Sequence, residues 1–86
     1  MARRPRVPVE VGPDKAPRAF TYMGVAYRVR VIGQWHLQDR WWEVIAERGR
    51  SNRYYFRVQT RDHQVFELYL DVACRPPLWM LDVIQD

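Results

Sequence analysis

Apolar and polar residues alternate along most of the chain from Phe20 onward. The segment VAYRVRVI, residues 25–32, alternates bulky apolar residues with alanine and arginine, and YYFRVQT (54–60) and VFELYLD (65–71) repeat the two-residue period. This period is typical of β-strands that place one face on a core and the other in water, as antiparallel sheets do. Gly24 and Gly33 bracket the first segment as turn positions. The pattern therefore predicts an antiparallel β-domain.

The segments 54–60 and 65–71 predict a hairpin whose register depends on the length of its loop. Their apolar faces coincide if Val58 lies opposite Leu68 and Phe56 opposite Leu70, with residues 62–64 as an odd-length loop. An even loop would shift one strand by a residue and bury a carboxylate, so we expect the odd loop. On the opposite face this register makes two pairs, Arg57 with Tyr69 and Gln59 with Glu67.

Both ends of the chain also carry strand patterns. Four of the six prolines fall within the first 17 residues and exclude a helix there. The valines at positions 7, 9 and 11 alternate around Pro8 and predict a short edge strand, where a proline interrupts no central ladder. Residues 1–6 are expected to form a mobile basic tail. After CRPP at residues 74–77, LWMLDVI predicts a last strand with Trp79, Leu81 and Val83 on one face.

Eighty-six residues suffice for one small domain. The predicted fold class is all-β, a small antiparallel meander of six or seven strands that forms either an open sheet or an SH3-like or OB-like small barrel. We expect a Pro/Arg-rich and partly disordered N-terminal arm over residues 1–17, followed by a single all-β domain over residues 18–86. The predicted core consists of Tyr27, Val29, Val31, Trp35, Trp42, Phe56, Val58, Phe66, Leu68, Leu70, Trp79 and Leu81.

Three of the four tryptophans lie within WHLQDRWW, residues 35–42. If residues 41–46 form a strand, Trp41 and Trp42 point to opposite faces. Trp41 shares its face with Glu43, which marks the solvent side, so the pattern predicts an exposed Trp41, a buried Trp42 and a buried Trp35. The alternative for residues 39–49 is one short helix that starts at an aspartate and ends at a glycine.

Composition places the chain among folded proteins of a reducing compartment. Apolar residues make up 48% of it and aromatic residues 14%, well above what disordered chains contain. The single cysteine, Cys74, cannot form an internal disulfide, whereas secreted domains of this size usually need several. No apolar stretch follows the basic N-terminus as in a signal peptide, and none approaches the length of a membrane span. We therefore expect a cytoplasmic protein without a membrane partner.

The charge is divided unevenly along the chain. Residues 1–18 carry +3, residues 19–61 carry +5 and residues 62–86 carry −4, for a net charge of +4. All but one of the basic residues are arginines, which pair with phosphate through two nitrogens and stack on bases. This distribution is compatible with two interpretations: a nucleic-acid footprint, or a solvated basic surface without a ligand.

The solvent face of the predicted sheet combines arginines with aromatic residues, as platforms for single-stranded nucleic acid do. The candidate nucleic-acid-binding residues are Arg28, Arg30, Arg40, Trp41, Tyr55 and Arg57, and Arg3, Arg4 and Arg6 would add unspecific phosphate contacts. The alternative is a protein interface, since tryptophan, tyrosine and arginine also anchor such interfaces. The basic strands and the acidic C-terminal segment would suit a homodimer.

Catalytic chemistry has little basis in this sequence. His36 and His63 are the only histidines, and neither is near Cys74 in the chain. Metal sites need three or four ligands at suitable spacing, and phosphate loops need clustered glycines; neither pattern occurs. We expect a protein that is not an enzyme and that uses no cofactor and no metal.

Three segments carry a family resemblance: PRAFTYMGVAYRVRVIGQWHLQDRWWEV, YYFRVQT and FELYLDVACRPPLWMLDVI. The chain resembles a family of short bacterial proteins of unknown function over residues 17–84. Similar segments occur at the C-terminus of, or beside, catalytically inactive Y-family polymerase homologues that act in damage-induced mutagenesis. The resemblance implies an accessory module of translesion synthesis or DNA repair, and a Y-family polymerase-like repair protein as a partner. It carries over no polymerase activity, because the acidic metal-binding motifs are absent. The matching positions are Phe20, Gly24, Tyr27, Val29, Trp35, Trp41, Trp42, Tyr54, Tyr55, Arg57, Val58, Tyr69, Asp71, Trp79 and Leu81.

Overall fold

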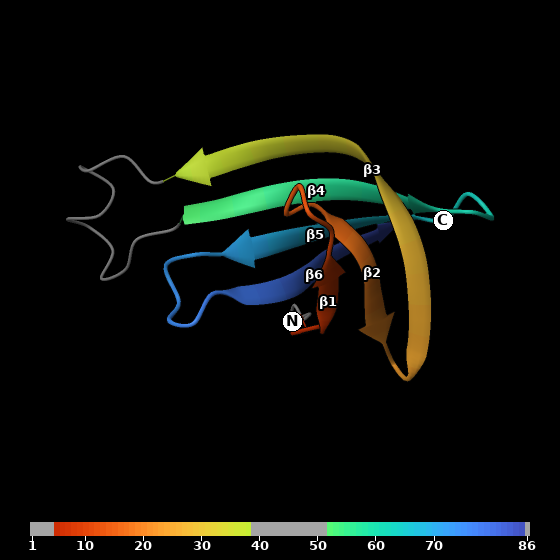
Figure 1. The fold of residues 1–86 in the computed structure, drawn as a ribbon, viewed down its shortest axis with the longest axis horizontal. Coiled ribbons are helices and arrows are strands. Elements are labelled where there is room, and N and C mark those ends of the chain that lie inside the picture. Colours follow the sequence, from red (N-terminus) through yellow and green to blue (C-terminus); the bar gives the residue numbers. More distant parts are fainter. Residues whose placement is uncertain (1–4, 39–51, 86) are drawn as a thin grey trace.

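A computed structural model describes the chain over residues 5–38 and 52–85. Its six strands form one antiparallel meander in which each strand pairs with the next along the chain. The sheet curls into an open half-barrel, and the described residues contain no helix (Figure 1). The all-β prediction is therefore confirmed. The strands are β1 (Val9–Val11), β2 (Pro17–Tyr22), β3 (Val25–Gln38), β4 (Asn52–Thr60), β5 (Val65–Asp71) and β6 (Leu78–Gln85).

The long strand β3 joins the two halves of the curled sheet. Its first residues, Val25–Arg28, pair with β2, and residues 29–38 pair with β4. A β-bulge falls between Val31 and Gly33, where the register with β4 shifts by one residue. Gly33 therefore lies inside β3, and the prediction of a turn there is wrong. Bulges bend a strand and increase its twist. In Figure 1, β3 curves between its β2 half and its β4 half, and this bend gives the sheet its half-barrel shape.

The N-terminal segment connects the two outer strands of the meander. The Val7 amide donates to the Trp79 carbonyl at 3.1 Å, and the Leu81 amide donates to the Pro5 carbonyl at 2.9 Å. β1 then pairs with β2 on the other side. The predicted edge strand over the three valines is confirmed for Val9–Val11. Pro5 and Arg6, which the sequence placed in a basic tail, lie beside β6, with Arg6 opposite Met80.

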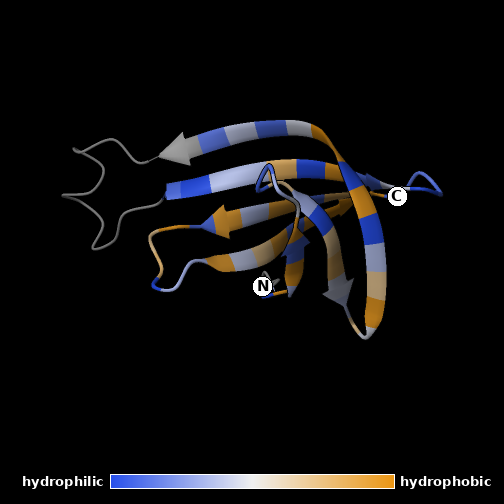
Figure 2. Cartoon of the chain, viewed as in Figure 1, coloured by the Kyte–Doolittle hydropathy of each residue, from blue (hydrophilic) through white to orange (hydrophobic). Residues whose placement is uncertain are grey.

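The core fills the inside of the curl. The rings of Phe20, Tyr27 and Phe66 pack against one another with centroids 5.0 to 5.2 Å apart. Six residues form the buried cluster: Val7, Phe20, Val58, Phe66, Leu68 and Leu81. Seven partly buried residues pack against it: Val9, Tyr22, Tyr27, Val29, Val31, Phe56 and Trp79. Figure 2 shows hydrophobic and hydrophilic residues alternating along β3 and β4, as expected when only one face meets this core.

Most of the predicted core is confirmed; the buried cluster has two additions, and the exceptions among the described residues are Trp35 and Leu70. Val7 and Phe20 belong to the buried cluster although the sequence did not place them there. The prediction that Trp35 is buried is wrong. The bulge in β3 reverses which side chains face inward beyond it, and Trp35 is 42% exposed. Trp42 lies outside the described residues, as do both alternatives for residues 39–49. Leu70 is partly buried but lies outside the cluster.

The β4–β5 hairpin has the odd loop that the sequence predicts but a different register. Val58 lies opposite Phe66 and Phe56 opposite Leu68, two residues from the predicted pairs. The three loop residues are 61–63, and the Thr60 amide donates to the Gln64 carbonyl at 2.9 Å. Both registers keep the apolar faces together. In the observed one Arg57 lies opposite Glu67, so that opposite charges form a cross-strand pair.

A second bulge alters the last strand. The register between β5 and β6 shifts between Glu67 and Leu68. Trp79 and Leu81 lie on the core side as predicted, opposite Leu70 and Leu68. Val83 instead lies opposite Glu67 and is exposed. The prediction that Val83 shares the inner face is therefore wrong, because an extra residue at a bulge reverses the alternation beyond it.

Candidate nucleic-acid interface

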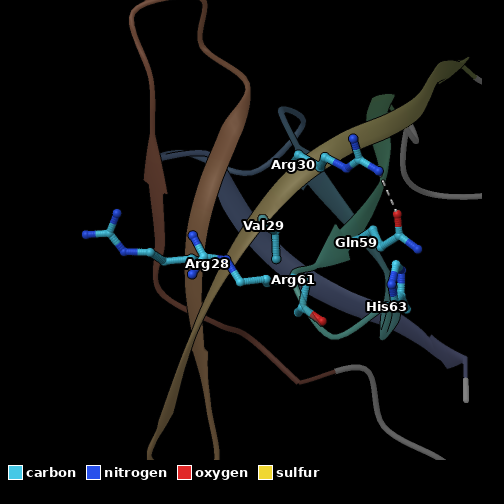
Figure 3. Close-up of a pocket in the computed structure, with 7 residues that line it drawn as sticks. Arg28, Val29, Arg30, Gln59, Arg61 and His63 are labelled. Carbon is cyan, nitrogen blue, oxygen red and sulfur yellow. Dashed lines mark hydrogen bonds between the residues drawn. The ribbon is translucent and has the colours of Figure 1, made fainter.

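A basic groove of about 440 Å³ opens on the outer face of the sheet, on the side opposite the core. Its sides come from β3, from the end of β4 and from the β4–β5 turn (Figure 3). The lining residues are Arg28, Val29, Arg30, Gln59, Thr60, Arg61 and His63.

Strand alternation and cross-strand pairing bring the groove residues together. Arg28 and Arg30 point outward from β3 because Tyr27, Val29 and Val31 face the core. Arg30 is the cross-strand neighbour of Gln59, and its Nη2 donates to Gln59 Oε1 at 3.2 Å (Figure 3). This hydrogen bond orients one guanidinium group across the groove.

The β4–β5 turn adds Arg61 and His63 to the groove. His63 has a φ of 70°, a left-handed conformation that lets three residues reverse the chain. The Thr60 hydroxyl fixes the turn, since it donates to Asp62 Oδ1 at 2.6 Å and accepts from the Gln64 amide at 3.0 Å. The hydrogen bond from Thr60 holds the pKa of Asp62 below its ordinary value, so this carboxylate is charged and already partnered. Within the described part of the chain, Arg28 and Arg61 form no ion pair.

A row of aromatic rings continues the outer face beyond the bulge in β3. Trp35, Tyr55 and Tyr69 come from three adjacent strands and lie opposite one another in the register. The Trp35 and Tyr55 rings are stacked, with centroids 5.2 Å apart and planes 4° apart, and Tyr69 packs against Tyr55 at 5.2 Å. Trp35 is 42% exposed, whereas Tyr55 is 7% and Tyr69 3% exposed. Trp35 is therefore the ring of this row that can meet a ligand.

Arginines flank the aromatic row on both sides. The Arg57 guanidinium lies 3.6 Å from Glu67 Oε2 and 5.8 Å from the centre of the Trp35 ring. Arg53 lies 4.7 Å above the Tyr69 ring, and its Nε is 3.8 Å from Asp71 Oδ2. Hydrogen bonding to the Tyr55 side chain raises the pKa of Arg53 above its ordinary value. Arg53 is a partly buried structural group, whereas Arg57 remains exposed beside Trp35.

The predicted binding residues separate into three groups. Arg28 and Arg30 lie in the basic groove, and Arg57 lies on the same face nearer the aromatic row. Tyr55 points to the predicted face but is buried between Trp35 and Tyr69, so it supports the row and offers no open ring. Arg40 and Trp41 lie outside the described residues, as do Arg3 and Arg4.

Sequence reasoning missed Arg61, His63 and Trp35. The odd loop length was the signal for the first two, because it allows a turn at residues 61–63 beside the strand that carries Arg30. No local signal placed Trp35 outside, since its position follows from the bulge.

Residues 5–38 and 52–85 contain no group of three or more histidine, cysteine, aspartate or glutamate side chains that could hold a metal ion. Over the same ranges, no helix has the length and apolar character of a membrane span.

Comparisons with known proteins give one match. A family model described as a domain of unknown function, DUF6504, matches residues 3–86. No curated protein and no solved structure matches the chain.

Proposed function

The chain belongs to the DUF6504 family, and from its outer face we propose that it is a non-enzymatic cytoplasmic module that binds single-stranded nucleic acid, most simply single-stranded DNA. The proposal rests on one observation: an exposed tryptophan lies on the same face of one sheet as a groove whose arginines form no ion pair with a described carboxylate. Its place in DNA repair or translesion synthesis, beside a Y-family polymerase-like protein, rests on the resemblance of its sequence to segments of such proteins.

The groove supplies the phosphate contacts. Arg28 and Arg61 carry charges that no described carboxylate neutralises, and Arg30 is held across the groove by Gln59. When such arginines bind phosphates, cations that were condensed on the nucleic acid are released into solution. This release drives much of the association of proteins with nucleic acids.

Trp35 supplies the stacking contact. Its ring is already held parallel to Tyr55, so little side-chain entropy is lost when a base stacks on its free face. A base on an aromatic platform contributes roughly 1 to 3 kcal/mol, and it does so for every base. Arg57, between the groove and the ring, is placed to contact the phosphate that follows the stacked base. Arg40 and Trp41 stay candidates of the same interface.

The test is a fluorescence anisotropy titration with a labelled single-stranded oligonucleotide and its duplex, at low and at physiological salt. The proposal expects tighter binding of the single strand, with tryptophan quenching that persists at physiological salt. Binding that disappears with salt and never quenches tryptophan would leave only a basic surface without a platform.

A second candidate function is protein association, as a homodimer or with a repair protein. The observation that favours it is the free edge of β3: over residues 29–38 β3 pairs with β4 on one side, and no described strand pairs with its other side. Free edges accept additional strands. Light scattering across protein concentration tests the homodimer, and a strict monomer would exclude it.

A further inference from the structure

A second cavity, of about 650 Å³, opens on the inner face of the sheet, away from the basic groove. It lies between the turn that precedes β2 and the far half of strands β3, β4 and β5. β2 pairs with β3 only over Val25–Arg28, so beyond that point this turn overhangs the inner face without closing onto it. The volume falls within the range of small-molecule sites.

A pair of stacked rings forms one wall of this cavity. His36 and Tyr54 are cross-strand neighbours, with ring centroids 4.2 Å apart and planes 6° apart. His36 Nε2 forms a hydrogen bond with Asn52 Oδ1, which fixes the orientation of the imidazole. Both side chains are exposed, so the stack has room for another flat ring. Phe56 and Leu70, partly buried beside them, give the cavity an apolar floor.

Polar groups lie on two sides of the stacked pair. Gln34 is exposed on β3, two residues before His36 and on the same face, and its amide offers both a donor and an acceptor. Lys15 lies at the rim, in the overhanging turn. The neighbouring Asp14 carboxylate is engaged, since its Oδ1 accepts from the Ala16 amide at 3.2 Å and lies 3.8 Å from Arg18 Nη2. In the described part of the chain Lys15 has no ion-pair partner, so the free charge at the rim is positive.

These features describe a ligand with three parts: a flat ring, a hydrogen-bonding edge on that ring, and an anionic group. We propose that the inner cavity binds a nucleoside monophosphate. The base stacks on the His36–Tyr54 pair, the Gln34 amide contacts its edge, and Lys15 contacts the phosphate. Proteins recognise unpaired bases in the same way, through aromatic stacking combined with side-chain hydrogen bonds. Trp35 and Tyr55 of the aromatic row also line this cavity, but the cavity shares no lining residue with the basic groove, and the inference does not depend on the proposed function.

The test is an NMR titration of the isotope-labelled protein with AMP, with adenosine and inorganic phosphate as partial ligands. The inference expects AMP to shift the amide signals of Gln34, His36 and Tyr54 and to bind more tightly than adenosine. Tyr54→Leu removes the stacking wall and should weaken AMP binding about tenfold, the value of one stacked base. Lys15→Asn removes the charge and keeps a residue that tolerates the left-handed φ of 65°. It should abolish the advantage of AMP over adenosine.

Two controls separate this site from the basic groove. Arg30→Ala should leave AMP binding unchanged while it weakens oligonucleotide binding, and Tyr54→Leu should do the reverse. Because Tyr54→Leu removes a side chain packed on His36, the thermal unfolding midpoint of this variant is measured as well. If Tyr54→Leu proves to be unfolded, Lys15→Asn still tests the site, because Lys15 lies on an exposed turn. No chemical-shift change up to about 10 mM AMP, which corresponds to negligible affinity, would overturn the inference. Loss of AMP binding in Arg30→Ala but not in Tyr54→Leu would overturn it as well.

Discussion

Trp35 of β3 and Tyr55 of β4 stack face to face across the sheet, with ring planes only 4° apart. The pairing has opposite consequences for the two residues. Tyr55 is buried by its neighbours, whereas Trp35 is 42% exposed. Offset aromatic pairs contribute about 0.5 to 1.5 kcal/mol beyond the area they bury, so stacking on Tyr55 holds the Trp35 ring in place. The outer face therefore consists of a rigid ring next to a basic groove.

Replacement of Trp35 tests the stacking step. Trp35→Ala should lower the affinity for single-stranded DNA by about tenfold or more, because one stacked base is lost. Trp35→Phe keeps a ring and should retain most of the affinity. Both affinities come from fluorescence anisotropy at physiological salt, and an alanine variant with unchanged affinity would remove Trp35 from the interface.

Replacement of Arg30 tests the phosphate step. Loss of one phosphate contact should reduce the slope of log affinity against log salt by about 0.7 for a single strand. Arg75→Ala is the matched control, since Arg75 is an exposed arginine in the β5–β6 turn, away from the groove. Equal slopes for the two variants would show that Arg30 makes no phosphate contact.

Truncation of Val7 tests the role of the N-terminal segment in the core. Val7 is 4% exposed and belongs to the buried cluster, so Val7→Ala should lower the free energy of unfolding by about 2 kcal/mol. Val11→Ala serves as control, because Val11 is 46% exposed and its loss should cost less than about 0.5 kcal/mol. Urea unfolding measures both variants. A loss for Val7→Ala as small as that expected for Val11→Ala would mean that the Val7 side chain contributes little to the core.

The turn beside the groove should respond to acid. The pKa of Asp62 is lowered from its ordinary value of 3.8 by the hydrogen bond from Thr60. The ionised carboxylate therefore stabilises the folded state at pH values above 3.8. As the pH falls below 3.8 and through the lower pKa of the folded state, this contribution is lost. Thr60→Val removes the bond and should raise the pKa of Asp62 toward 3.8. Carboxyl NMR between about pH 2 and pH 6 measures the shift, and an unchanged pKa in the variant would contradict this cause.

Alkylation of Cys74 tests the expectation that the chain is not a thiol enzyme. Burial, with help from the neighbouring Asp71, raises the pKa of this thiol above its ordinary value of 9.0. At about pH 8 the folded protein should therefore react with iodoacetamide more slowly than the protein unfolded in urea, because the thiolate is the nucleophile. Faster reaction in the folded state would reopen a catalytic role for Cys74.

The sequence by itself determined the all-β class, the antiparallel pairing and most of the core. Period-two alternation is a local property of the chain, and it fixes which residues share a face within an uninterrupted strand. That is why Val58, Leu68 and Leu81 were predicted correctly, and why Arg28 and Arg30 were placed on the outer face. Loop parity likewise follows from the need to keep two apolar faces together.

Only the tertiary structure decided the positions of Trp35, Val83 and Val7. A bulge reverses the alternation beyond it, and the place of a bulge depends on how two strands pair and pack over their whole length. The burial of Val7 follows from hydrogen bonds between the N-terminal segment and β6, more than 70 residues later in the chain. The same long-range packing exposed Trp35 on the outer face, where local alternation predicted an exposed Trp41. Local alternation carries no information about contacts between distant strands.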